Sequence, residues 1–415
     1  MNMFPIAYIA GYFPLRSETF VYREVRELRA RGWRVTAVSL NTIRDQHDET
    51  LADLQKGRIF CYEPGWFFEA IIEIFAHPVC AFRTIVAGIQ DLLNPRETTS
   101  GRDRVKSLGQ AFAGLKLAAD LRKNGVRHIH CHFAHAPASV GMYAAMQLGV
   151  PFSFTGHAND LFQRRHLLKK KLNRAKFVAC ISDWHREFYR AIEPSSPARY
   201  EVIRCGVPIE HWSFQDPALK APRIDGILQV LTIARLVEKK GVDMLIRALH
   251  AYGAKSTRSW KLTIAGDGPM MDKLKEIAQH LAVSHCIDWR GAVTNEIVPQ
   301  LLADADVFAL PCRTDQSGDK DGIPVVLMEA MACGTPVIAG NVAAISELVE
   351  NGKSGLLVDG TNIDEVVNAI EKLDRDPPLR KSLAAGGRTR VEAEFSLTHS
   401  VSKLEKLFGT ADERG

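Results

Sequence analysis

The sequence predicts an α/β protein made of two doubly wound domains, each a parallel sheet with helices on both faces. Short apolar runs alternate with helical patterns along the chain, and this alternation pauses near residues 206–222 and then starts again. A chain of 415 residues, 46% of them hydrophobic, is also long enough to bury two cores. These observations favour two similar domains over one large one.

The candidate strands are short apolar runs bounded by glycine, proline or charged residues. The first half has six, at residues 6–13, 35–40, 128–133, 151–156, 177–182 and 200–207. The second half has six more, at 227–236, 261–268, 286–293, 307–312, 336–340 and 355–358. We expect an N-terminal domain at 1–205, a second domain at 206–395 facing it across a cleft, and a last helix at 396–415 that packs back on the first domain.

Composition excludes some classes of protein. The net charge of +5 is too small for a dedicated nucleic-acid binder. Eight cysteines occur without any C-x-x-C pair, so we expect reduced thiols. The first residues, "MNMFPIAYIAGYFP", have no basic stretch before their apolar run and no cleavage signal, which favours a cytoplasmic protein.

Residues 66–93 are strongly apolar, but Glu69, Glu73 and Arg83 interrupt them too often for a membrane-spanning helix. We expect two helices hinged at Pro78. They either cover the core of the domain or dip into the surface of a bilayer.

Residues 163–176, "QRRHLLKKKLNRAK", contain seven lysines and arginines and no acid. Such a run is typical of a solvated helix face. It also suits an acceptor carried on a lipid diphosphate at the inner face of the cell membrane, because anionic lipids attract basic segments.

Two fixed cations precede a helix in "IARLVEKKGVDMLIRAL". A strand ends at Ala234, Arg235 follows it, and Lys240 comes just before the helix. The N-terminus of a helix favours negative charge, so this segment is typical of a diphosphate site. A solvated charge run is the alternative.

The segment "LTIAGDGPMM" follows the next strand. Gly266 and Gly268 would let the backbone come close to a ligand, but Met271 replaces the third glycine of a dinucleotide fingerprint. An ordinary turn, with Asp267 as its turn residue, is an equal alternative.

In "DGIPVVLMEAMACGTPVIAG", Asp321 stands eight residues before Glu329. Gly322, Ile323 and Pro324 lead into a helix, whose start tolerates proline. One carboxylate therefore lies in the loop and the other one to two turns into the helix. Carboxylates placed in this way can accept hydrogen bonds from the vicinal hydroxyls of sugars and riboses.

Four histidines lie in "HIHCHFAH". On a strand His128, His130 and His132 share one face, while His135 lies beyond the strand end. This number of imidazoles can bind zinc, but no carboxylate stands near them in the sequence to orient the rings, so we predict no metal site. We expect His130 and His132 at the edge of the cleft, His135 in the loop towards an acceptor, and about half of the four packed as structural residues.

Together, the motifs from Arg235 to Glu347 resemble those of the retaining family 4 glycosyltransferases, which have the GT-B fold of two Rossmann-like domains. They are "ARLVEKKG", "AGDGP", the two acids described above and "SELVENGKSGLLV". The first half continues the resemblance through "FPLRSETFVYREVREL", "HCHFAH", "FTGHANDLF", "CISDWHREF" and "VIRCGVPIEHW". The order and the sequences of these motifs are most similar to those of the colanic-acid and amylovoran type of exopolysaccharide glycosyltransferase.

The resemblance implies roles for the matching residues. Arg235 and Lys240 hold the donor's diphosphate as it leaves, and Glu329 binds the ribose hydroxyls. Asp321 holds the transferred sugar from a position where the family usually has glutamate, and His157 lies beside that sugar.

Other matches are looser. Gly11 to Glu18 form the loop near the donor phosphate and the acceptor, although the family's double glycine is missing. Glu347 matches the glutamate of the closing G-x-P-E element. The donor-binding loops contain Gly266, Gly268, Gly322, Ile323 and Pro324.

We therefore expect a metal-independent, retaining hexosyltransferase that needs no cofactor and uses a UDP- or GDP-linked sugar. Its acceptor is a saccharide, lipid-linked, in exopolysaccharide or surface-polysaccharide biosynthesis. The alternatives are a sugar-nucleotide epimerase or hydrolase of the same fold, and a non-catalytic partner subunit of a glycosyltransferase. The presence of His157, Arg235, Lys240 and Glu329 together argues against the last.

Overall fold

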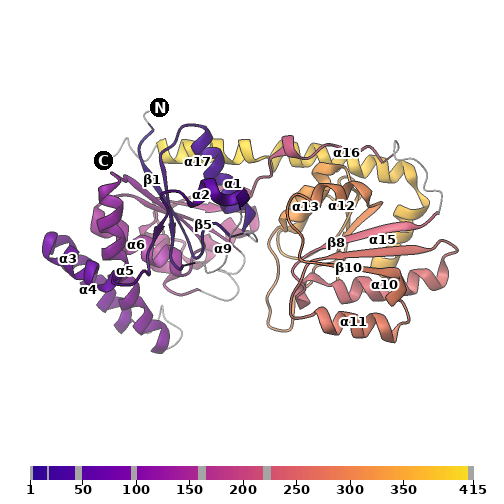
Figure 1. Cartoon of the computed structure of the whole chain (residues 1–415), viewed down its shortest axis with the longest axis horizontal. Coiled ribbons are helices and arrows are strands. Elements are labelled where there is room, and N and C mark those ends of the chain that lie inside the picture. Colours follow the sequence, from indigo (N-terminus) through magenta and orange to yellow (C-terminus); the bar gives the residue numbers. More distant parts are fainter. Residues whose placement is uncertain are drawn as a thin grey trace. The chain divides into compact units, whose positions relative to one another are not determined.

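A computed structural model describes residues 3–15, 18–42, 49–94, 101–157, 165–217 and 226–409 (Figure 1). The chain divides into two compact units. Unit 1 consists of residues 1–205 and 397–415, and unit 2 of residues 206–396.

Unit 1 contains a seven-stranded parallel sheet in the order β3-β2-β1-β4-β5-β6-β7. The strands are β1 (Ile6–Ala10), β2 (Val35–Ser39), β3 (Ile59–Phe60), β4 (His128–His132), β5 (Phe152–Gly156), β6 (Phe177–Cys180) and β7 (Arg199–Val202). The chain proceeds from β1 to the β3 edge and then crosses back to β4. The carboxyl ends of β1 and β4 therefore form the switch point where doubly wound sheets bind ligands.

Helices cover both faces of this sheet. They are α1 (Thr19–Ala30), α2 (Ala52–Gln55), α3 (Trp66–Ala76), α4 (Pro78–Leu93), α5 (Gly101–Lys123), α6 (Ala136–Leu148), α8 (Leu168–Arg174), α9 (Asp183–Ile192) and α17 (Leu397–Gly409). Helices α5 and α6 share one core with β1, β4 and β5. On the opposite face α1 and α17 pack together, and Arg31, which directly follows α1, lies 2.7 Å from Glu405 of α17.

Unit 2 contains a six-stranded parallel sheet in the order β10-β9-β8-β11-β12-β13. The strands are β8 (Leu228–Ile233), β9 (Trp260–Ala265), β10 (Ile287–Gly291), β11 (Val307–Leu310), β12 (Val337–Gly340) and β13 (Leu356–Val358). The helices are α10 (Val242–Lys255), α11 (Met271–His280), α12 (Val298–Asp304), α13 (Val325–Cys333), α14 (Ile345–Leu348), α15 (Ile363–Arg375) and α16 (Pro377–Glu394). Its switch point lies at the carboxyl ends of β8 and β11.

The α/β prediction is confirmed, because each predicted strand is present and both sheets are parallel. The sequence did not predict β3, which has only two residues. The apolar segment 66–93 forms two helices that separate at His77 and Pro78, as expected. All eight cysteines are free thiols. In the described part of the chain, no helix has the length and apolar character needed to cross a membrane.

Candidate functional site

Several predicted site residues of unit 2 lie around the carboxyl ends of β8 and β11. After β8 the chain passes the exposed Arg235 and makes a 3-10 turn at Glu238–Lys240. Gly241 then starts α10 with a φ of +67°, and a Cβ there would lie 2.0 Å from the carbonyl oxygen of Pro311, just after β11. Only glycine lets these two loops pack so closely, and this packing places Lys240 beside β11.

Lys240 is ion-paired with Asp321, the residue predicted to hold the sugar. Its Nζ lies 2.9 Å from Oδ2 of Asp321, and the two side chains are 14% and 15% exposed. Burial alone would lower the pKa of Lys240, but Asp321 and its neighbours raise it. Burial alone would raise the pKa of Asp321, but Lys240 and then Lys239 lower it. Both groups are therefore charged at neutral pH.

Two further cations extend this cluster, and sequence reasoning did not assign them a role. Nζ of Lys239 lies 2.9 Å from Asp319 and 3.5 Å from Asp321. Arg313 pairs with Asp243 at 3.0 Å, and its backbone N–H donates to the carbonyl of Lys239. The sequence signal for Lys239 was its position directly before Lys240.

The glycines of "AGDGP" allow close contacts within the protein backbone. A Cβ on Gly266 would lie 1.8 Å from the carbonyl oxygen of Ala234, and one on Gly268 would lie 2.5 Å from that of Leu236. Asp267 accepts a hydrogen bond from the backbone N–H of Gly268. It is therefore a turn residue, as in the ordinary turn that the sequence offered as an alternative to a ligand-binding loop. The glycines let the loop after β9 pack against the loop after β8.

The second carboxylate of the acid pair lies in α13. Gly322 and Ile323 lead to Pro324, which directly precedes the helix, and Glu329 follows just over one turn inside. Glu329 is 8% exposed. Glu347 lies in the short helix α14 beyond β12, where Arg390 binds its backbone carbonyl.

In unit 1 the histidines of β4 share one face, as predicted, and this face is covered by α17. His128 and His130 are both 0% exposed and lie near the ring of Phe408 at centroid distances of 5.1 and 5.6 Å. Burial lowers the pKa of His128 to about 3 and that of His130 well below its usual value. The prediction that His130 lines the edge of the cleft is wrong, because this ring lies in the core.

The parallel register explains how the histidine rings on this face find hydrogen-bonding partners. Ser153 of β5 is the register partner of His130. Its hydroxyl lies 2.8 Å from Nδ1 of His130 and 2.6 Å from Nε2 of His128, and the hydroxyl of Thr155 lies 2.9 Å from Nε2 of His130. These contacts are those of structural histidines.

His132, at the end of β4, contacts the predicted active-site histidine. Its Nδ1 lies 3.2 Å from Nε2 of His157, and its Nε2 lies 3.1 Å from Glu24 of α1. The fold thus supplies the carboxylate that the sequence around the histidines lacks. Glu24 could have been found, because it stands between Val21 and Leu28 on the buried face of an amphipathic helix.

This group also meets the geometric requirement for a metal site. One ligand atom from each of Glu24, His130 and His132 lies within 4.8 Å of the others. Each ring nitrogen of the two histidines already has a hydrogen-bonding partner within the protein. A hydrogen-bonded network accounts for the arrangement, and the absence of a metal stays a prediction.

The remaining residues of the first unit lie in loops. His135 caps α6 through Nδ1, which accepts the N–H of Ala136 at 2.8 Å. Glu18 directly precedes α1, and Gly11 directly follows β1. Residues 16–17 of that loop, and 158–162 of "FTGHANDLF", lie outside the described residues.

Some lysines of the basic run at 163–176 stabilise the fold. Lys171 is fully buried, and its ammonium donates to the carbonyls of Ala134, His135 and His166. Lys170 pairs with Asp91 of α4 at 2.5 Å. Arg165, Lys169 and Arg174 are exposed, whereas residues 163–164 are outside the described part.

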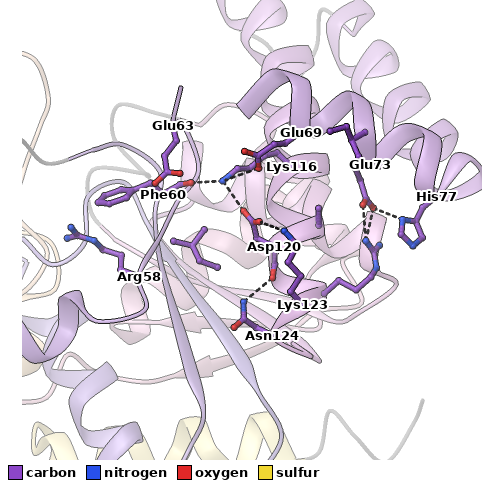
Figure 2. A pocket seen from close by; sticks show the side chains of 14 residues that line it. Arg58, Phe60, Glu63, Glu69, Glu73, His77, Lys116, Asp120, Lys123 and Asn124 are labelled. Carbon is purple, nitrogen blue, oxygen red and sulfur yellow. Dashed lines mark hydrogen bonds and ion pairs between the residues drawn. The ribbon is translucent and has the colours of Figure 1, made fainter. Parts of the chain in front are cut away.

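A cavity of about 770 Å³ lies in unit 1 between β3, α3 and α5 (Figure 2). Several of its charged side chains are paired with one another. Lys116 binds Asp120 at 2.8 Å, and Arg122 binds Glu73 at 2.8 Å. The cavity lies on the sheet face opposite the histidines, and we assign it no part in the site.

Two family models match the chain. The model described as "Glycosyltransferase Family 4" matches residues 17–211, and the one described as "Glycosyl transferases group 1" matches residues 220–390. The boundary between them lies close to the boundary between the two units.

Two curated relatives are informative. The putative colanic acid biosynthesis glycosyltransferase WcaL of Salmonella typhimurium is 34% identical over 418 residues, which cover 96% of this chain and 98% of that protein. The GDP-mannose-dependent alpha-(1-6)-phosphatidylinositol monomannoside mannosyltransferase of Mycobacterium tuberculosis is 33% identical over 247 residues. That match covers 58% of this chain and only 63% of the mannosyltransferase.

Solved structures share the fold over nearly the whole chain. Sucrose-phosphate synthase from Thermosynechococcus elongatus has a TM-score of 0.74 at 20% identity, covering 98% of both chains. Anabaena Alr3699/HepE, solved in complex with UDP and glucose, has a TM-score of 0.69 at 16% identity, covering 98% of this chain and 100% of that one.

Proposed function

The chain belongs to glycosyltransferase family 4 and has the GT-B fold, and from this premise we propose that it transfers a hexose from a nucleoside-diphosphate sugar to a saccharide acceptor. The transfer retains the configuration of the sugar and needs neither metal nor cofactor. The product is an exopolysaccharide or surface polysaccharide, since WcaL is named for colanic acid biosynthesis.

The observation that carries the proposal is the cation cluster at the N-terminus of α10. Lys239 and Lys240 lie there, at the switch point of the sheet. Asp321 pairs with Lys240 at 2.9 Å. A diphosphate offers Lys240 a stronger counter-ion, so Asp321 then turns to the hydroxyls of the sugar.

The leaving group is the nucleoside diphosphate, whose charge increases as the glycosidic bond breaks. Arg235 and Lys240 stabilise this charge together with the dipole of α10, in the role that a metal ion has in other transferases. Glu329 holds the ribose. Electrostatic stabilisation of this kind is often the largest contribution to catalysis.

His157 lies beside the donor sugar in this proposal. The acceptor hydroxyl attacks on the face that the diphosphate vacates, and the departing phosphate takes its proton. The carbon–oxygen bond to the acceptor therefore forms with the configuration of the donor.

The nucleotide is the first property to test. HepE was solved with UDP and glucose, whereas the mycobacterial relative is named as dependent on GDP-mannose. We expect either UDP or GDP, and not both equally, to raise the melting temperature, because a ligand that binds the native state stabilises it. The rise should survive EDTA and disappear in Glu329→Ala. A rise that EDTA abolishes would overturn the metal-free site.

The same panel, supplied with nucleoside-diphosphate sugars and saccharide acceptors, tests the reaction. We expect sugar transfer with retained configuration, measured by NMR of the product. Nucleotide release without transfer would identify a hydrolase, and loss of the sugar's original configuration in the free donor would identify an epimerase.

We further propose that the acceptor is lipid-linked and is met at the cytoplasmic surface of the membrane. Helices α3 and α4 expose many large apolar side chains, between 41% and 81% accessible: Phe67, Phe68, Ile72, Phe75, Val79, Phe82, Ile89 and Leu93. An exposed apolar patch of this kind marks an interaction site. The salt bridge from Lys170 to Asp91 places the cations of α8 beside α4, which suits anionic lipid headgroups.

Vesicle sedimentation tests this surface. The full chain should bind vesicles that contain anionic lipid, and the double variant Phe75→Ser/Phe82→Ser should lose this binding while its melting temperature stays unchanged. Ile297→Ser, which removes an exposed apolar side chain of unit 2, is the matched control. Equal binding of both variants, or no binding by the native chain, would contradict the proposal.

A further inference from the structure

The cavity between β3, α3 and α5 adjoins the exposed apolar side chains of α3. Ile72 belongs to both, because it lines the cavity and is 67% exposed. Beyond Ile72 the lining is mostly charged, with Ile59, Phe60 and Ala119 as its apolar members. A molecule that fills the cavity and lies on α3 therefore needs a charged part and an apolar part.

The charges that line the cavity balance. They are four cations, Arg58, Lys116, Arg122 and Lys123, and four acids, Glu63, Glu69, Glu73 and Asp120, with His77 besides. A lining of this kind favours neither a free anion nor a free cation. It suits a ligand that is neutral as a whole.

Six of these eight charged side chains are paired with one another. The ion pairs are Lys116–Asp120 at 2.8 Å, Lys123–Asp120 at 3.5 Å, Lys116–Glu69 at 4.0 Å and Arg122–Glu73 at 2.8 Å. Such pairs form the walls of the cavity, and recognition depends on the charges that remain.

Arg58 and Glu63 remain, and neither is joined to these ion pairs (Figure 2). The guanidinium of Arg58 donates to the carbonyl of Phe13 at 2.8 Å and lies 4.3 Å from the centroid of the Phe60 ring, but within the described ranges it pairs with no acid. Burial lowers the pKa of Arg58, as expected of a cation without a counter-ion. No described residue pairs with the carboxylate of Glu63 or donates to it. The cavity thus offers a ligand one cation and one carboxylate.

We propose that this cavity binds the phosphoethanolamine headgroup of a bilayer lipid, with its phosphate on Arg58, its ammonium on Glu63 and its acyl chains along the apolar side chains of α3. Arginine is well suited to phosphate, and a volume of about 770 Å³ is ample for the headgroup. The inference deepens the proposed function by naming the lipid that docks unit 1, and it rests on that function for the presence of a membrane.

The lining distinguishes ethanolamine from choline. A primary ammonium donates hydrogen bonds to a carboxylate, whereas a quaternary ammonium has no N–H and is typically bound by a cage of aromatic faces. The cavity has one phenyl ring in its lining, Phe60, and Arg58 already lies over it. Choline therefore finds no cage here.

Arg58 also connects the cavity with the loop after β1, through the carbonyl of Phe13. The resemblance places this loop, from Gly11 to Glu18, near the acceptor. A headgroup on Arg58 therefore holds the membrane surface beside the place where a lipid-linked acceptor is expected.

A soluble probe tests the cavity without a bilayer. Saturation-transfer NMR of the full chain should detect binding of glycerophosphoethanolamine, and much weaker binding of glycerophosphocholine and of glycerol 3-phosphate. Arg58→Gln and Glu63→Gln should each abolish the signal at an unchanged melting temperature. No signal from glycerophosphoethanolamine, or equal signals from all three probes, would overturn the proposal.

Vesicles test the same preference in a membrane. At a fixed content of anionic lipid, replacing phosphatidylcholine by phosphatidylethanolamine should tighten binding of the native chain about fivefold, the effect of one exposed ion pair. Arg58→Gln and Glu63→Gln should lose this preference but keep binding to the anionic lipid. Arg34→Gln and Glu276→Gln, which remove exposed charges outside the cavity, are the matched controls and should keep it.

A preference for phosphatidylethanolamine that persists in both cavity variants would reflect the packing of the bilayer, and would contradict a headgroup site. Neither measurement depends on sugar transfer. If the chain transfers no sugar but binds the headgroup probe, the cavity assignment stands and the proposed function fails. Transfer by a chain that ignores the probe would have the opposite meaning.

Discussion

At the carboxyl end of β4 in unit 1 the side chains are mostly buried rings, whereas beside β11 in unit 2 they are lysines and aspartates in ion pairs. The same doubly wound architecture surrounds both. Burial lowers the pKa of His157 in the first unit, while pairing raises the pKa of Lys240 and lowers that of Asp321 in the second. Burial in unit 1 therefore keeps His157 neutral, whereas pairing in unit 2 keeps Lys240 and Asp321 charged.

This difference suits the two tasks of a sugar transfer. A diphosphate is recognised by charge, so a site for it must keep its cations ionised until the ligand arrives. A sugar is neutral and is recognised by hydroxyl direction, so its neighbours must hold fixed donors and acceptors. Three substitutions, with decreasing expected effects, test this difference between the units.

Lys240→Ala should have the largest effect, because it removes the charge on which unit 2 depends. We expect kcat/KM to fall about 1000-fold, as when a main stabilising donor is lost from an active site. The melting-temperature rise caused by the preferred nucleoside diphosphate should disappear. Lys275→Ala, an exposed cation of α11, should change neither quantity.

A second variant separates this effect from misfolding. Removing one partner of a partly buried ion pair also destabilises the fold, because the other charge is left behind. The double variant Lys240→Met/Asp321→Asn should recover much of the stability but none of the activity. Native rates in either variant would contradict the assignment of the donor site.

Phe408→Ala should have the next largest effect, and it acts on unit 1. The ring of Phe408 packs on Phe177 and on the histidines of β4, so its loss opens a cavity over the buried face. We expect the free energy of unfolding of unit 1 to fall by about 4 kcal/mol. Calorimetry should show this change in one transition and leave that of unit 2 in place, whereas Lys406→Ala, exposed on the same helix, should have little effect. A shift of both transitions would show that the units do not unfold separately.

The positions of the candidate site residues were easier to predict in unit 2 than in unit 1, for a physical reason. Arg235 and Lys240 lie in the segment after β8, and Asp321 and Glu329 lie in the loop and helix after β11, so their neighbourhood follows from the parallel topology. The strands themselves were predictable because both sheets are buried on both faces and read as apolar runs. Family resemblance then supplied roles that spacing alone does not give.

The site of unit 1 depends on partners that are distant in sequence. Glu24 is 108 residues from His132, and α17, which covers His128 and His130, lies at the far end of the chain. We expected the last helix to pack back on the first domain, but no local pattern shows that it covers β4. The prediction for His130 therefore failed, whereas the alternation that puts three histidines on one face was correct.

His128→Leu should have the smallest effect, and only in acid. The folded-state pKa of His128 is lowered to about 3 by burial, whereas the unfolded value is about 6.5. Between these two values the unfolded chain binds a proton that the folded chain does not, so stability falls as the pH drops below about 6.5. At pH 7.5 this contribution is absent.

Leucine cannot bind that proton, and Ser153 keeps His130 as a partner. The difference in free energy of unfolding between His128→Leu and the native chain should therefore shift in favour of the variant by about 2 kcal/mol from pH 7.5 to pH 5. Urea unfolding of unit 1 at the two pH values measures this difference. The pair between Lys240 and Asp321 in unit 2 should not respond in this range, since the pKa of Asp321 is lowered from its ordinary acidic value and the pair is lost only at a lower pH. An equal loss of stability in unit 2 between pH 7.5 and 5 would remove the distinction between a site built on neutral rings and one built on paired charges.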